Sequence, residues 1–519
     1  DPLILTFDCG TQSTRAMLFD KKGALIAKSK VTFEPYFSIE EGYAEQYAEV
    51  YWDKIKEASV SLKAKYPAEW ERVIAVSITT MRDNCVCVDK DGKVLRPVIL
   101  WLDRREADDV KLPLKQKLLF SAIGMGEGLK MHARVSPCNW IRQKEPEVWA
   151  NTYKYLMFSG YVNFLFTGKM LDSTANMIGH IPFDYKNRCW QKPSGLTYPV
   201  TPVETEKLCD LVEPGELIGY VTEKASAETG IPVGMPVIAA GSDKGCETLG
   251  TGCNGDGIAS LSFGTTATIQ FTTTKYVEPT PFMPAYPAMI KGKYNPETQI
   301  FRGYWMVTWF KNEFAAKEEL KAKELGISSE VLLDKLLEVV PAGSDGLLLQ
   351  PYWSPVLKAP EARGAVVGFS DKHTKGHLYR AIIEGIGYGL LEGLKTMEKR
   401  AKFNIKRLTV SGGGSGSDAI CQITADMCGL PVSRVQTYET SGLGAAMVGF
   451  VGMNEFKDLD EARDNMVHYG DEFLPNPENY RVYSVTYDRI YKNMYKCVKP
   501  LYAEMRNVRN ILKNKQENK

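Results

Sequence analysis

The segment Phe7–Asp20, FDCGTQSTRAMLFD, places a carboxylate, a glycine and several hydroxyl or amide side chains between two apolar runs. Glycine lets the backbone come close to a ligand, and the N–H groups of such a turn can converge on one anion. A carboxylate is tolerated beside a phosphate when Mg²⁺ lies between them. The pattern predicts a phosphate and Mg²⁺ site that comprises Asp8, Gly10, Thr11, Gln12, Ser13 and Arg15. The alternative is a hairpin whose polar side chains bond only to their own backbone.

A second carboxylate, Asp243, follows a predicted buried strand and stands at or beside the start of a helix. The partial positive charge of a helix N-terminus favours an ionised carboxylate. An ionised Asp near a transferable phosphate can accept the proton of an attacking hydroxyl, so Asp243 is the candidate catalytic base. Asp243 and Asp8 are also the two candidate metal ligands. The alternative role for Asp243 is that of a helix N-cap.

A glycine-rich loop, Gly412–Gly416, connects a predicted strand at Arg407–Val410 to a helix that ends before Gly429. It is not a Walker A loop, because no Lys-Ser or Lys-Thr follows at the required spacing. Glycines at a strand end nevertheless leave room for a flat base or a ribose, and the next helix begins with a positive end. The loop is therefore either a nucleotide site or a plain connection.

The elements that must position these residues alternate between strands and helices. Strands are predicted from Leu3, at Arg15–Asp20 and at Ala24–Val31, which together form a three-stranded meander. A helix is predicted around Tyr47–Lys63 and a further strand at Arg72–Thr80. Alternation of this kind is typical of an α/β fold.

The segment Ala259–Thr273 repeats the plan of the first one, with a strand, a Gly-Thr turn and a second strand. Gly264-Thr265 corresponds to Gly10-Thr11, so the chain is expected to contain two domains built on one plan. The predicted division is 1–252 for the first domain, 253–487 for the second, and 488–519 for a C-terminal helix and tail. The alternative is that Gly-Thr is only a common hairpin turn.

Composition limits the partners and the compartment. The chain of 519 residues carries 64 Lys plus Arg against 63 Asp plus Glu, which gives no indication of a nucleic-acid partner. Its eleven cysteines form no CxxC pair, which favours reduced thiols in a cytoplasmic protein. It has no apolar run of about 18 residues, so no membrane span is expected, and its first residues are predicted to form a strand rather than a signal peptide.

Taken together, these segments resemble the FGGY family of carbohydrate kinases over essentially the whole chain. The family's DxGTxSxR start is matched by Asp8, Gly10, Thr11, Ser13 and Arg15, and a second signature is matched by Gly364–Glu384. The segment Leu443–Ala446 matches the family's closing helix. The first signature fits less well around Trp140, because Pro137 replaces its usual Lys.

The resemblance implies two ribonuclease-H-like domains of the actin and Hsp70 superfamily, an α/β fold with a central cleft. It implies ATP and Mg²⁺ as cofactors, Asp243 as the catalytic base and a hinge closure that excludes water. It leaves a homodimer open. The implied nucleotide contacts beyond the first hairpin are Gly264, Thr265, Thr266, Gly412, Gly413, Gly414 and Ser417.

The resemblance also implies a substrate site, which comprises Arg82, Asp83, Trp101, Asp103, Arg105 and Asp243. A two-pronged contact from Arg82 suits vicinal hydroxyls on a chain longer than glycerol. The expected substrate is a ketose such as xylulose or ribulose, phosphorylated on a terminal hydroxyl. The alternatives are a glycerol- or erythritol-type polyol and an autoinducer-type substrate. A different class of function is a nucleotide-switched chaperone or filament protein without kinase activity.

Overall fold

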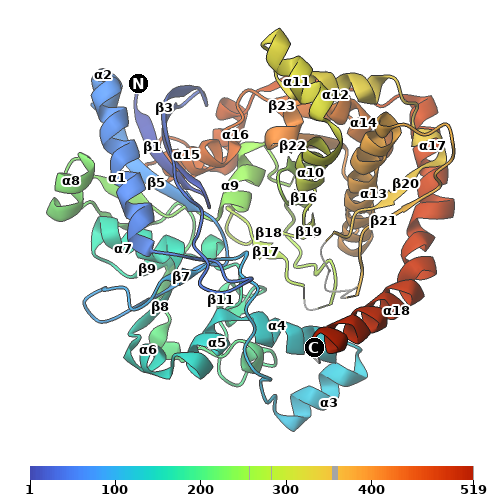
Figure 1. Ribbon diagram of the computed structural model, residues 1–519. Helices are drawn as coiled ribbons and strands as arrows, with labels where there is room; N and C mark the ends of the chain where they lie inside the picture. Colours follow the sequence, from blue (N-terminus) through green and yellow to red (C-terminus); the bar gives the residue numbers. More distant parts are fainter. Residues whose placement is uncertain (256, 282, 354–360, 518–519) are drawn as a thin grey trace.

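The computed structural model describes residues 1–255, 257–281, 283–353 and 361–517, which form two α/β domains side by side (Figure 1). The N-terminal domain is built on a six-stranded sheet with the order β13-β14-β5-β1-β2-β3. These strands are β1 (Leu3–Cys9), β2 (Ser13–Asp20), β3 (Leu25–Thr32), β5 (Val73–Thr80), β13 (Leu217–Tyr220) and β14 (Pro236–Ile238). Strands β1, β2 and β3 form the predicted antiparallel meander, and β5 and β14 run parallel to β1.

Strand β1 is buried along its whole length because helices cover both faces of this sheet. Leu3, Leu5 and Phe7 belong to one hydrophobic core together with α1 (Ala48–Lys65). Ile4, whose side chain points to the opposite face, belongs to a second core together with α15 (Thr440–Gly452). The apolar run that predicted a buried strand is thus explained by burial on both sides.

The C-terminal domain repeats the same plan in a second six-stranded sheet, with the order β19-β16-β15-β22-β23-β24. The strands are β15 (Ile258–Phe263), β16 (Ala267–Phe271), β19 (Glu297–Ile300), β22 (Arg407–Ser411), β23 (Val432–Val435) and β24 (Tyr469–Phe473). Three antiparallel strands are followed by two parallel ones and an antiparallel edge strand, as in the first sheet. The repeated Gly-Thr hairpin therefore predicted the internal repeat correctly.

Further elements surround the two sheets. The further helices of the N-terminal half are α2 (Pro67–Trp70), α3 (Leu114–Ala122), α4 (Gly126–Val135), α5 (Pro137–Lys144), α6 (Pro146–Asn151), α7 (Phe158–Thr167), α8 (Glu223–Thr229) and α9 (Asp243–Gly250). A four-stranded sheet in this half consists of β4 (Glu45–Gln46), β7 (Val98–Ile99), β6 (Cys85–Val88) and β8 (Lys154–Met157). Two strand pairs complete it, β9 (Leu171–Ser173) with β12 (Asp210–Val212) and β10 (Phe183–Asp184) with β11 (Cys189–Trp190). In the C-terminal half the further elements are α10 (Trp305–Phe314), α11 (Ala316–Leu325), α12 (Ser329–Glu338), α13 (Lys375–Ala401), α14 (Asp418–Cys428), α16 (Leu459–Met466), α17 (Pro477–Thr486) and α18 (Lys492–Glu517), with the pairs β17 (Tyr286–Pro287) and β18 (Tyr294–Asn295), and β20 (Leu348–Gln350) and β21 (Ala365–Val367).

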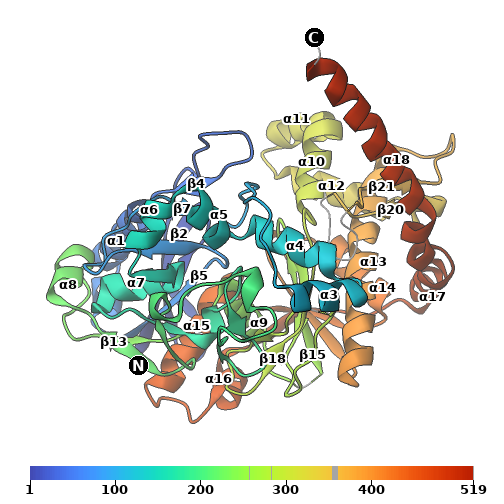
Figure 2. The same cartoon turned by 90° about the horizontal axis from the view of Figure 1, so that it is seen from below.

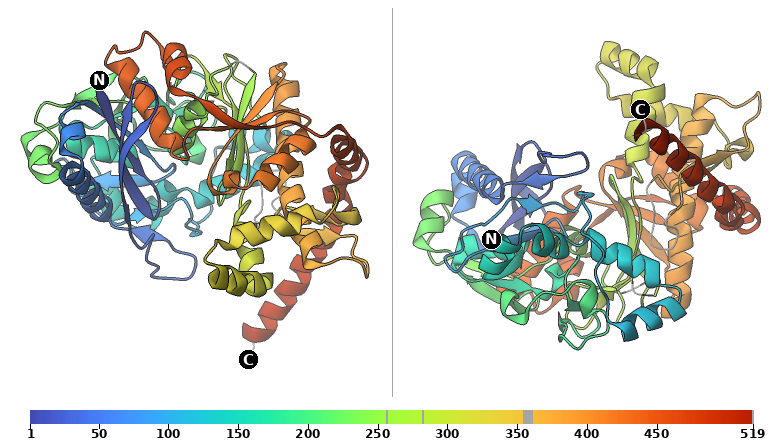
Figure 3. Two further views of the ribbon diagram at one scale, coloured as in Figure 1. Left: turned by 90° about the horizontal axis from the view of Figure 1, so that it is seen from above. Right: turned by 60° about the horizontal axis from the view of Figure 1, so that its bottom comes forward.

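The C-terminal helix begins earlier than the sequence predicted. Helix α17 continues through one π-helical turn at Tyr487–Tyr491 into α18, so the expected start at Asp488 falls inside a helical segment. Figures 2 and 3 show α18 projecting from the body of the C-terminal domain. Among the described residues, none of the helices has the length and apolar character that crossing a membrane requires.

Each half of the chain has a hydrophobic core of its own, and a third core is built by both halves, so a division of the sequence at residue 252 separates segments that pack together. Helix α15, from the second half of the chain, contacts β1 and β5 of the first sheet and lies against α9. Its residues Leu443 and Ala446 share a core with Ile4 and Leu249. The division at residue 252 therefore stays a prediction, and the third core joins the two halves across it.

The contact between α9 and α15 brings backbone against backbone. A side-chain carbon added at Gly444 would lie 1.9 Å from the carbonyl oxygen of Cys246, and one added at Gly250 would lie 2.0 Å from the carbonyl oxygen of Thr440. Separations this short cannot be relieved by rotating a side chain, so only glycine fits at either position.

We expect Gly444→Ala to destabilise the protein by about 2 kcal/mol or more, because an overpacked contact must push two helices apart. Urea unfolding measures this change. The matched control is Gly470→Ala, since an added carbon at Gly470 meets no heavy atom within 4 Å. Equal stabilities for the two variants would contradict this account of the contact.

Candidate active site

A cavity of about 1560 Å³ opens between the two domains. The first Gly-Thr hairpin contributes Gly10 and Thr11 to its wall, and the second contributes Gly264, Thr265 and Thr266. Asp243 and Lys244, at the start of α9, line the same cavity. Two turns that lie about half the chain apart therefore face one space, with a carboxylate between them.

The order of the strands explains why these side chains meet. Asp8 lies near the end of β1, Arg82 follows β5 and Asp243 follows β14, and these three strands are parallel neighbours. A bridge between Thr80 and Ser242 continues the pairing beyond the ends of β5 and β14. Carboxyl ends of parallel strands meet at one edge of a sheet, which is where open α/β sheets commonly bind ligands.

Asp243 is the first residue of α9, and the N-cap of this helix is Ser242, whose hydroxyl accepts the N–H of Gly245 at 3.2 Å. The N-cap role considered for Asp243 therefore belongs to its neighbour. The Asp243 carboxylate accepts the N–H of Lys244 at 2.7 Å. Burial raises the pKa of Asp243 above its ordinary value, although the positive charges of Arg82 and Lys244 oppose this rise. The carboxylate is consequently a better proton acceptor than an exposed Asp.

Asp8 pairs with Arg15, which lies directly opposite it on β2, at 2.8 Å. Arg15 also approaches Glu439 at 3.4 Å, so two carboxylates compensate its charge. Neither Arg15, Gln12 nor Ser13 lines the cavity. The geometry thus gives no support to the expectation that Arg15 offers a free positive charge to a phosphate.

The residues around Asp8 suit Mg²⁺ only in part. Burial, opposed by the charge of Arg15 and assisted by that of Asp243, raises the pKa of Asp8 to about 6. Two carboxylates therefore lie close enough to influence each other. Within the described ranges, no group of three or more His, Cys, Asp or Glu side chains could hold a metal. A cation at this place would need ligands from water and phosphate as well, which is the usual environment of Mg²⁺.

The glycine loop lies beside the second hairpin, because β22 pairs with β15. Gly413–Gly416 form one 3₁₀ turn, and a side-chain carbon at Gly412, where φ is 80°, would lie 2.9 Å from the backbone of Phe263. Ser417 caps α14 and donates to Asp334 at 2.6 Å. Gly412, Gly413, Gly414 and Ser417 do not line the cavity, so nucleotide contacts at these positions remain a prediction.

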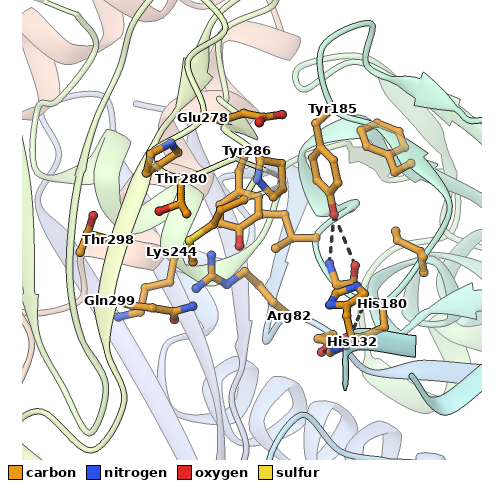
Figure 4. A pocket seen from close by; sticks show the side chains of 18 of the residues that line it. Arg82, His132, His180, Tyr185, Lys244, Glu278, Thr280, Tyr286, Thr298 and Gln299 are labelled. Atoms are coloured by element: carbon orange, nitrogen blue, oxygen red, sulfur yellow. Dashed lines mark hydrogen bonds and ion pairs between the residues drawn. The ribbon is translucent and has the colours of Figure 1, made fainter. Parts of the chain in front are cut away.

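Arg82 and Asp83 both reach the cavity, but each has a partner that the sequence did not indicate. Arg82 donates to both carboxylate oxygens of Glu297, at 3.0 and 3.1 Å, and its guanidinium lies over the ring of Tyr286. Figure 4 shows Arg82 extending toward Lys244 and Gln299, away from the pair His132 and His180. Arg82 and its sequence neighbour Asp83 therefore pair with other residues and not with each other.

Asp83 accepts the backbone N–H of His180 at 2.8 Å and lies 2.7 Å from its ring nitrogen Nδ1. Burial opposes the charged imidazolium, but the Asp83 carboxylate outweighs it and raises the pKa of His180. The ring of His132 stacks on that of His180, with centroids 4.3 Å apart. No sequence motif pointed to these histidines, which lie far from Asp83 in the chain.

Trp101 lines the cavity and donates its indole N–H to the Thr11 hydroxyl at 3.0 Å. It therefore connects the predicted substrate segment to the first hairpin. Lys244 also lines the cavity and donates to Glu247 at 2.8 Å and to Ser262 at 2.6 Å. Because Lys244 directly follows Asp243 in the sequence, its presence at the site could have been predicted from that neighbour.

Asp103 and Arg105 do not line the cavity, so their expected contact with substrate stays a prediction that the geometry does not favour. They bind each other at 2.8 Å, and Arg105 also pairs with Glu45 at 2.8 Å. The Arg105 guanidinium lies over the rings of Tyr43 and Trp140, with centroids at 3.9 and 4.6 Å. Both side chains are only 3% exposed, so this buried network supports the domain rather than a ligand.

We expect Arg105→Met to lower the free energy of unfolding by about 3 kcal/mol or more, because it leaves the buried carboxylate of Asp103 without its charge partner. The KM for sugar should stay within about twofold, since a folded variant keeps the cavity wall. Urea unfolding measures the stability, and steady-state kinetics measures the KM. The control is the substitution Arg104→Met at the exposed neighbouring residue. A large rise in KM at unchanged stability would restore Arg105 to the substrate site.

Comparison with known proteins agrees with this architecture. The sequence model of the N-terminal domain of the FGGY family of carbohydrate kinases matches residues 3–250, and that of the C-terminal domain matches residues 259–453. An uncharacterized sugar kinase, YgcE of Escherichia coli, is 27% identical over 95% of this chain and 93% of its own. A xylulose kinase of Lactococcus lactis is 26% identical over 95% and 96%.

Two further proteins complete the comparison. A gluconokinase of Bacillus subtilis is 25% identical over 89% of this chain and 90% of its own. The crystal structure of a xylulose kinase from Rhodospirillum rubrum shares the fold, with a TM-score of 0.82 at 24% identity over 96% of this chain and 100% of that one. The two matched domains, which together span most of the sequence, show that the chain belongs to the FGGY family of carbohydrate kinases.

Proposed function

We propose that this carbohydrate kinase transfers the γ-phosphoryl group of ATP to a terminal hydroxyl of a neutral polyhydroxylated sugar, with a ketose such as xylulose or ribulose as the first candidate. The observation that carries the proposal is the position of Asp243, which lines the cavity between two Gly-Thr hairpins. Burial raises the pKa of this carboxylate. A carboxylate of this kind matches the requirement for a general base beside a transferred phosphoryl group.

In this proposal, different residues of the cavity have different roles in the reaction. The carboxylate of Asp243 accepts the proton of the sugar hydroxyl, whose oxygen forms a bond to the γ-phosphorus while the bond from that phosphorus to the bridging oxygen of ADP breaks. The backbone N–H groups of the hairpins at Gly10 and Gly264 are the donors for phosphate oxygens. Mg²⁺, if held near Asp8 and Asp243 through oxygen ligands, would supply neutralising charge to the phosphates.

Two observations support a neutral sugar. The ionisable groups at the sugar end of the cavity, Arg82 and Asp83, already have partners of opposite charge, in Glu297 and His180. Several relatives of similar length bear the name xylulose kinase, at 25–26% identity. The gluconokinase relatives make an acidic sugar the competing candidate. Glycerol- or erythritol-type polyols and autoinducer-type substrates remain alternative substrates. A nucleotide switch without kinase activity is excluded, because the chain belongs to a family of carbohydrate kinases.

A coupled assay of ADP release with a panel of sugars tests the proposal. We expect the highest kcat/KM for a ketopentose among ketopentoses, deoxyketoses, tetritols, glycerol and gluconate, because the cavity offers paired charges to neutral hydroxyls. Inactivity on every neutral sugar together with turnover of gluconate would overturn it.

Replacing the candidate base isolates the chemical step. We expect Asp243→Asn to lower kcat by about 10² or more, since an amide cannot accept the hydroxyl proton. The matched control is Asp184→Asn, a carboxylate that lines the same cavity and bonds to Asn187. Near-normal turnover of the Asp243 variant at saturating ATP and sugar would remove this residue from the role of base.

A further inference from the structure

An ion pair at the sugar end of the cavity joins the two domains. Arg82 follows β5 of the first sheet, and Glu297 begins β19 of the second, 215 residues later. The guanidinium donates two parallel hydrogen bonds to the carboxylate, a geometry that is stronger and more directional than a single contact. The Glu297 side chain is 1% exposed, whereas that of Arg82 is 16% exposed and reaches the cavity.

Glu297 is held in place from its other side. It lies directly opposite Gln270 on β16, and the Gln270 side-chain amide donates to its carboxylate. The Thr248 hydroxyl on α9 in turn donates to the Gln270 carbonyl oxygen at 2.6 Å. The carboxylate therefore cannot turn away from Arg82 without leaving buried polar groups unpaired, which would cost free energy.

Two other cationic side chains that line the cavity are also paired. Lys244 pairs with Glu247 at 2.8 Å, and His180 pairs with Asp83 at 2.7 Å. Lys186 and Lys192 line the mouth of the cavity, but both are exposed, so water and salt screen their charges. A substrate carboxylate beside Arg82 would therefore meet buried cations that already have partners, together with the carboxylates of Asp243 and Asp83, and burying it unpaired would be costly.

We propose that Glu297 determines the substrate class by neutralising Arg82, so that the site accepts neutral polyhydroxylated sugars and rejects sugar acids of the same length. Glu297 acts through Arg82 and is a positioning residue: its carboxylate occupies the edge of the guanidinium, formed by Nη1 and Nη2, that a sugar acid would need. A binding site can reject a competing ligand by leaving that ligand's charged group without a partner, which is a recognised source of specificity. The inference rests on the proposed function, in which Arg82 contacts the sugar.

The test uses two probes of equal chain length, xylitol and xylonate. They differ at one end, where xylitol has a CH₂OH group and xylonate has a carboxylate. Each is measured as a competitive inhibitor of ketose phosphorylation and as a ligand that shifts the thermal unfolding temperature. In the wild-type protein xylonate should bind at least about tenfold more weakly than xylitol. In Glu297→Gln, which keeps the shape but removes the charge, this ratio should fall by about tenfold or more, because Arg82 becomes available to the carboxylate.

Two further variants separate the charge from the structure. Glu297→Asp retains the charge and should retain most of the discrimination against xylonate. Glu278→Gln removes a carboxylate that lines the same cavity and bonds to Tyr276, and it should leave the ratio unchanged. A merely structural role for Glu297 would weaken the binding of both probes equally.

The outcomes distinguish the two proposals. If wild-type protein prefers xylitol and Glu297→Gln keeps that preference, the inference about Glu297 is overturned and the proposed function stands. If wild-type protein phosphorylates no neutral sugar and binds xylonate more tightly than xylitol, both are overturned. If Glu297→Gln does not fold, the wild-type ratio still decides: equal binding of the two probes overturns the inference.

Discussion

The active site depends on the backbone contact between α9 and α15. Asp243 begins α9, and the end of this helix leads within a few residues into β15, whose hairpin forms the opposite wall of the cavity. Gly250 and Gly444 let the two helices touch, and the Ser441 hydroxyl on α15 donates to the backbone carbonyl oxygen of Asp243 at 3.2 Å. One contact therefore fixes the candidate base relative to both domains.

The same contact explains how the two sheets become one molecule. A sheet of this type must be covered on both faces, and the first sheet takes one of its covers from the second half of the chain. Helix α15 supplies this cover and completes the burial of β1. The cleft between the domains thus lies beside a continuous core, which holds the two hairpins facing each other.

Charge at the site follows a consistent pattern of compensation. Asp8 pairs with Arg15, Arg82 with Glu297, and Lys244 with Glu247. Among the ion pairs of the described residues, none includes Asp243. Burying a carboxylate without such a pair raises its pKa, and a raised pKa is what a proton acceptor needs. The group proposed to do chemistry is therefore a buried carboxylate that no ion pair neutralises, although the charges of Arg82 and Lys244 lie near it.

The sequence by itself determined the local elements, the repeat and the family. Hairpins at Gly10 and Gly264 and the strand, loop and helix around Gly412 depend on hydrogen bonds between near neighbours, which residue types predict. Tertiary structure alone decided the pairing of Arg82 with Glu297, the contacts of Arg105 with Glu45 and Tyr43, and the packing of α15 on the first sheet. The physical reason is that a carboxylate or guanidinium can bind a ligand or an opposite charge equally well. Which of the two it meets depends on segments that lie tens or hundreds of residues away and approach only when the chain folds.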